Sequence, residues 1–156
     1  MKISNLDTKS PQDDGAFMHL EHTKFGHVMY SGEGADEHGR WVSDREPGDE
    51  QRVGLVVRGF EARSVQAFTR EQQRKNLANS KKSKPTPLAD LEFENGIKLA
   101  CVLIVDFVNI EDENGDPLEP TDENKRQFIT ISDDVSRQVV KFARERDNFF
   151  EVLSSD

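Results

Sequence analysis

Three histidines near the start of the chain have the side chains and the close spacing that a zinc site requires. His19, His22 and His27 follow the pattern H-x2-H-x4-H, and zinc is commonly bound by imidazole nitrogens. In an extended segment, however, His19 and His22 point to opposite faces, and no cysteine stands beside them to complete a ligand set. We therefore expect exposed histidines in a β region and no metal site.

The acidic run at residues 111–116 has the oxygen-rich composition of a calcium loop. An EF-hand loop places oxygen ligands at positions 1, 3 and 5 and a glycine at position 6. With Gly115 at position 6, the apolar Ile110 takes position 1 and offers no side-chain oxygen. The run is therefore predicted to be a solvated acidic turn, and no metal or other cofactor is expected.

Cys101 is the only cysteine of the chain and its one candidate thiol nucleophile. It stands in the apolar run 99–107, and burial among apolar groups raises the pKa of a thiol and makes it unreactive. The chain contains no G-x-S-x-G, P-loop or G-x-G-x-x-G motif. We therefore expect a protein that is not an enzyme and that acts by binding.

The composition limits the class of partner. The chain has 156 residues, about one domain, and a net charge of −9, which repels phosphate backbones, so no nucleic-acid binding is expected. A single cysteine excludes an intramolecular disulfide and fits a reducing compartment. The longest apolar run is far too short to span a bilayer, and no signal peptide opens the chain. These features predict a soluble intracellular protein without membrane contact.

The pattern of glycines, prolines and apolar residues predicts an α+β fold, with a small antiparallel β region near the N-terminus followed by a helical C-terminal half. We expect a flexible arm at 1–14, a β region at 15–60 and a helical region at 61–156, with the last two forming one compact unit. The expected strands are residues 16–20, 25–30, 40–42 and 52–58.

The second half of the chain predicts helices with recognisable ends. Thr121 and Ser132 are expected N-caps, each followed by two acidic residues that favour the positive end of a helix dipole. Residues 97–110 permit either a helix or a strand, and we favour a buried helix that ends near Asp106. The expected segments are a surface helix at 61–79, an exposed loop at 79–87, and helices at 88–106, from 121 onward and at 133–153.

Two groups of side chains are candidates for binding a partner. The first is a basic patch that offers electrostatic contact with an acidic protein, or else a solvated helix face: Arg70, Arg74, Lys75, Lys81, Lys82 and Lys84. The second is an apolar set on the last predicted helix: Phe142, Phe149, Phe150 and Leu153. Because two adjacent helical residues cannot face the same core position, we expect one of Phe149 and Phe150 to be available to a partner, unless the helix simply docks on its own domain.

The order of several short segments resembles a group of small proteins encoded in the structural modules of tailed phages and prophages. These are commonly described as tail assembly chaperones or uncharacterised tail proteins. One departure is Phe107-Val108-Asn109, where relatives often have Trp-x-Gly before the acidic turn. The segments that carry the resemblance are Asp-Asp-Gly at 13–15, the strand at 53–59, the Lys/Arg-rich helix, the apolar helix, the acidic turn at 112–118, Pro-Thr-Asp-Glu-Asn at 120–124 and Arg-Glu-Arg-Asp-Asn-Phe-Phe at 144–150.

This resemblance implies a non-enzymatic chaperone that binds the tail tube or tape-measure protein in the cytoplasm of the infected bacterial host. Two alternatives stay open: a virion structural protein of the neck, tail or capsid surface, and a host-directed regulatory protein. A homo-oligomer is also compatible with the sequence. Under the chaperone hypothesis the terminal helix is the expected contact surface, and the acidic body of the protein resists self-association.

Overall fold

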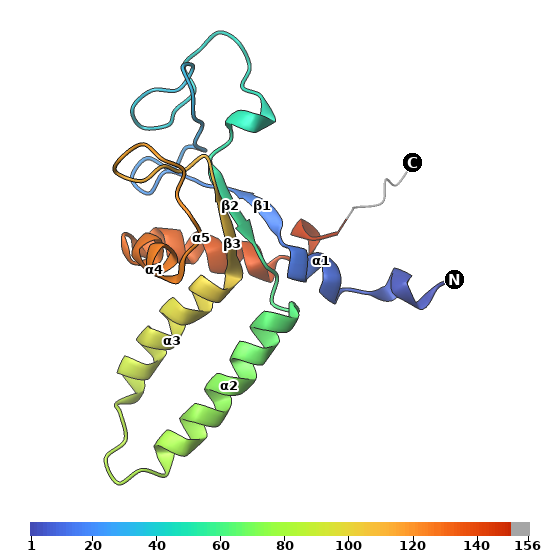
Figure 1. Cartoon of the computed structure of the whole chain (residues 1–156), viewed down its shortest axis with the longest axis vertical. Coiled ribbons are helices and arrows are strands. Elements are labelled where there is room, and N and C mark those ends of the chain that lie inside the picture. Colours follow the sequence, from blue (N-terminus) through green and yellow to red (C-terminus); the bar gives the residue numbers. More distant parts are fainter. Residues whose placement is uncertain (151–156) are drawn as a thin grey trace.

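A three-stranded antiparallel sheet lies at the centre of the protein, with loops at one end and helices around it (Figure 1). The computed structural model describes residues 1–150, apart from the side chains of Leu88, Ala89 and Leu91. The strand order is β1-β2-β3, with β1 at Ala16–His19, β2 at Gly54–Val57 and β3 at Ile104–Val108. This arrangement confirms the predicted α+β class.

The central strand β2 is paired along both edges and contributes side chains to the core. Leu55 lies opposite Met18 of β1 and Phe107 of β3, and all three side chains are in the core. Gly54 allows strands β1 and β2 to approach closely, since a Cβ at this position would collide with the carbonyl oxygen of Met18. Any side chain here would push β1 away from β2.

The third strand does not come from the region where the sequence predicts it. Residues 25–30 and 40–42 form only isolated bridges within a long loop region, which also holds the short helix η2 at Asp49–Gln51. The predicted helix at 88–106 is wrong at its end: α3 spans Leu88–Leu103, and residues 104–106 belong to β3. A register shift opposite Val56 and Val57 allows Ile104 and Phe107 to be buried together.

Four long or medium helices complete the core. Helices α2 (Arg63–Ser80) and α3 form a hairpin that projects from the sheet, while α4 (Asp122–Thr130) and α5 (Asp133–Arg144) pack against the base of α3 (Figure 1). Both predicted N-caps are confirmed: the Thr121 hydroxyl accepts the N–H of Asn124 at 3.1 Å, and the Ser132 hydroxyl accepts that of Asp134 at 3.2 Å.

The last predicted helix is shorter than expected. Helix α5 ends at Arg144 because Glu145 has an extended backbone, with φ −84° and ψ 101°. The side-chain amide of Asn148 donates to the carbonyl of Phe142 at 2.9 Å, which satisfies an acceptor of the final turn. A short 3₁₀ helix, η3 at Arg146–Asn148, follows.

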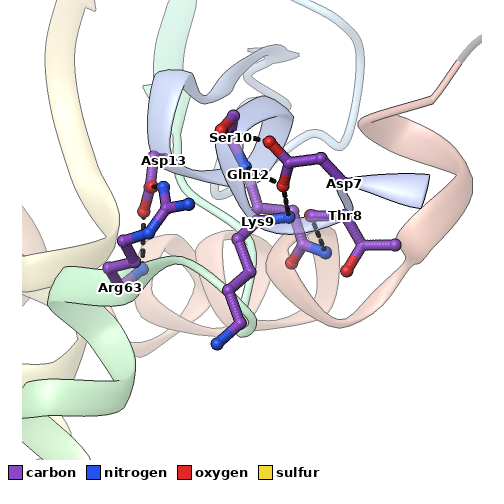
Figure 2. A network of polar contacts seen from close by, with 7 residues as sticks. All are labelled: Asp7, Thr8, Lys9, Ser10, Gln12, Asp13 and Arg63. Atoms are coloured by element: carbon purple, nitrogen blue, oxygen red, sulfur yellow. Dashed lines mark hydrogen bonds and ion pairs between the residues drawn. The ribbon is translucent and has the colours of Figure 1, made fainter. Parts of the chain in front are cut away.

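The N-terminal segment contains two short helices, η1 at Ile3–Leu6 and α1 at Lys9–Asp14. The carboxylate of Asp13 accepts the backbone N–H of Arg63 at 2.5 Å and pairs with its guanidinium, so α1 supplies a cap for the start of α2 (Figure 2). Gln12 is only 2% exposed, and its amide donates to Glu61 at 2.9 Å. Residues 9–14 are therefore anchored to α2, while flexibility of the whole arm stays a prediction.

Candidate functional site

The aromatic residues at and just after the end of α5 pack mostly against other residues of the same chain. Phe149 is buried and meets the ring of Phe142 edge to face, with 5.7 Å between the ring centroids. Phe150 is half-buried, and the guanidinium of Arg146 lies 5.6 Å from its ring centroid. Leu153 lies outside the described residues. Of this predicted contact set, Phe150 therefore has more exposed surface than Phe149.

The basic patch maps to the projecting hairpin. Its cations lie along the solvent face of α2 and on the loop that joins α2 to α3, and every one of them is exposed. Arg74 pairs with Glu71 of its own helix at 2.7 Å, and this contact lowers the pKa of the Glu71 carboxyl. Within the described part of the chain, the lysines of the patch form no ion pair. The hairpin therefore presents positive charge on a protein that is negative as a whole.

Two exposed apolar side chains lie on the same hairpin. Leu77, in the last turn of α2, is 60% exposed, and Phe93, in the second turn of α3, is 69% exposed. Both therefore stand close to the connecting loop at 81–87. Nothing in the sequence pairs these two residues, but Leu77 has Gln73 and Lys81 four residues away on either side, a local sign that it belongs to no apolar stripe.

The histidines do not form the H-x2-H-x4-H set that the sequence suggested. His19 stands apart, with its Nε2 2.7 Å from the carbonyl oxygen of Met29. His22 stacks on His27 with 5.1 Å between ring centroids, and His38 of the same loop region meets His22 edge to face at 5.8 Å. Of these side chains, His27 and His38 border a hollow of about 510 Å³. In residues 1–150, no group of three or more His, Cys, Asp or Glu side chains is placed to hold a metal ion.

Cys101 lies half-buried on α3. Burial raises the pKa of its thiol, which outweighs the opposite effect of the nearby Arg126 and Lys125 charges. A raised thiol pKa leaves little thiolate at neutral pH. The side chain therefore contributes to packing, in agreement with its apolar setting in the sequence.

None of the helices described for residues 1–150 has both the length and the apolar character needed to cross a membrane. Comparisons with protein-family models, with curated proteins and with solved structures found no match to this chain. The candidate site is a projecting helical hairpin that carries two exposed apolar side chains near its far end and cations on α2 and the connecting loop.

Proposed function

We propose that this protein is a non-enzymatic tail assembly chaperone of a tailed phage, which binds the tail tube or tape-measure protein through the α2–α3 hairpin. The observation that carries this proposal is the exposure of Leu77, which has Arg74 and Lys81 three and four positions away in the sequence, and of Phe93 on the other helix of the hairpin. Apolar side chains ringed by polar ones are typical of protein-binding surfaces. The resemblance of the segments at 112–118 and 144–150 to small phage tail proteins supports the choice of partner.

The size of this surface suits a contact that must be released. Burying one large apolar side chain contributes about 1.5–3 kcal/mol, while association costs about 4–15 kcal/mol in lost freedom. Leu77 and Phe93 therefore hold a partner only together with further contacts along the hairpin. The lysines accelerate encounter with an acidic partner but add little to its retention. Such binding is reversible, as a chaperone requires before assembly is complete.

The proposal is tested by co-expression of the tagged protein with the tail tube and tape-measure proteins of its own phage, followed by capture. We expect the double variant Leu77→Asp, Phe93→Asp to retain less than a tenth of the captured tail protein, because two charges replace the apolar anchors. Val42→Asp is the control, since Val42 is similarly exposed, at 62%, and belongs to the loop region between β1 and β2 rather than to the hairpin. Equal capture by both variants would remove the hairpin from the proposal.

Purified virions separate the chaperone from the alternative structural role. A chaperone acts in the cytoplasm of the infected host and is absent from the mature particle by mass spectrometry. A fixed copy number in virions would instead identify a structural component of the neck, tail or capsid surface. Capture of a host protein, without a tail defect on deletion of the gene, would favour a regulatory role.

A further inference from the structure

An apolar groove lies between the β3–α4 loop and α4, and the described residues that line it belong to these two segments and not to the hairpin. Its volume is about 270 Å³, which is smaller than the roughly 300–1,000 Å³ typical of small-molecule pockets. The apolar wall is formed by Ile110, Leu118, Phe128 and Ile131, of which Ile131 is 75% exposed. A hollow of this size accommodates one or two apolar side chains rather than a metabolite.

The rim of this groove is negatively charged. Glu111, Asp112 and Glu113 are exposed along one side, and among the described residues 1–150 no lysine, arginine or histidine lines the groove. Asp116 and Glu119 of the same loop border an adjoining hollow beside Asp112. Carboxylates that surround an apolar floor complement a ligand with an apolar side chain among cations. This pattern is opposite in charge to that of the hairpin.

The groove is held in shape by hydrogen bonds of the loop backbone. The N–H of Leu118 donates to the Ile110 carbonyl at 2.9 Å, and the Asp112 carboxylate accepts the N–H groups of Asn114 and Asp116 at 2.8 and 3.0 Å. This pairing confirms the predicted acidic turn. At the other end, the amide of Asn124 donates to the Glu119 carbonyl at 2.9 Å. A loop that is already ordered loses little conformational freedom when it binds.

We infer that this groove binds a basic amphipathic helix of another protein, with a leucine-sized side chain in the hollow and lysines or arginines against the acidic rim. Charge complementarity favours such a segment over an acidic or neutral one. The cations of a second copy's hairpin match the rim, but a second copy is a poorer occupant because they belong to a body of net charge −9 that the whole protein repels. The residues that line this groove differ from those of the hairpin surface, so binding here does not depend on the proposed function.

The test uses a labelled 16-residue peptide of alanine and lysine with two leucines four positions apart, and its twin with glutamate at every lysine. Fluorescence anisotropy with the whole protein should show binding of the lysine peptide alone. Ile131→Asp should weaken that binding at least tenfold even though it adds negative charge. Val42→Asp adds the same charge elsewhere and should leave the affinity unchanged or slightly higher. Non-specific attraction of the lysine peptide to the acidic protein increases with the negative charge of the protein.

Several outcomes would overturn the inference. These are no binding of the lysine peptide, equal binding of the glutamate twin, or equal affinities for the wild type and Ile131→Asp. Sedimentation in which Ile131→Asp abolishes self-association would make a second copy the occupant instead. The hairpin variant Leu77→Asp, Phe93→Asp should bind the peptide normally, so a failure of the groove and a failure of the hairpin are distinguishable. Circular dichroism checks that each variant is folded.

Discussion

At the residue scale, His22 is built into its turn as a neutral side chain. Its Nδ1 accepts the backbone N–H groups of Lys24 and Phe25, at 3.1 and 3.3 Å, and so cannot carry a proton without losing both. Burial lowers the pKa of His22, and the neighbouring His27, His38 and Lys24 charges lower it further. Asp36 opposes this effect only weakly. The folded protein therefore resists protonation of this ring.

This arrangement predicts a pH dependence of stability with a definite sign. A histidine whose pKa is depressed by folding binds its proton more readily in the unfolded chain, so the free energy of unfolding falls as the pH drops below about 6.5. His22→Asn keeps an acceptor for the two N–H groups and has no titratable ring. Urea unfolding at pH 7.5 and 5.5 should show a smaller loss for the variant. An equal loss in both proteins would contradict the assignment.

At the element scale, the end of α5 is fixed by one of two adjacent phenylalanines. Phe149 is buried against Phe142, whereas Phe150 is half-buried beside Arg146. Phe149→Ala should reduce the free energy of unfolding by about 3 kcal/mol, because a buried ring leaves a cavity. Phe150→Ala should cost less than about 1 kcal/mol. Chemical denaturation followed by circular dichroism measures both, and a larger effect at Phe150 would show that the two roles are reversed.

Local signals predicted the elements whose ends depend on neighbouring residues. The caps at Thr121 and Ser132 and the acidic turn are examples, because their hydrogen bonds join residues a few positions apart. Other boundaries depend on distant chain segments. Residues 104–108 form a strand because β2 offers them an edge to pair with. Residues 25–30 form only isolated bridges, and the edge of β2 that they would need is taken by residues 104–108.

The exposure of the candidate binding surfaces likewise depends partly on local sequence and partly on distant segments of the chain. The exposure of the basic patch follows from composition, since lysine and arginine are rarely buried. The polar neighbours of Leu77 four positions away are a local sign of its exposure, whereas the exposure of Phe93 follows from the projection of the hairpin beyond the sheet, which no local pattern records. Similarly, the burial of Gln12 depends on its bonds to Glu61, 49 positions further along the chain.

At the scale of the whole molecule, the hairpin should be less stable at its far end than at its base. Among the side chains of α2 and α3 that the structure describes, the buried ones lie toward the sheet: Val65 near the start of α2, and Ile97, Ala100 and Leu103 in the second half of α3. Local opening follows the density of buried contacts. Hydrogen exchange measured by mass spectrometry should therefore be at least tenfold faster at residues 72–80 than in β2. Uniform protection along the hairpin would show that the distal half is covered in solution.

The position of the hairpin between β2 and β3 also bears on how the chain reaches its fold. These strands pair antiparallel although residues 58–103 separate them, and closing so long a loop has an entropic cost that slows the formation of non-local contacts. Helices form within about a microsecond, far faster than distant strands pair. Once α2 and α3 associate, they bring the ends of β2 and β3 together, so the segment that projects furthest in the native protein also acts as a template for assembling its centre.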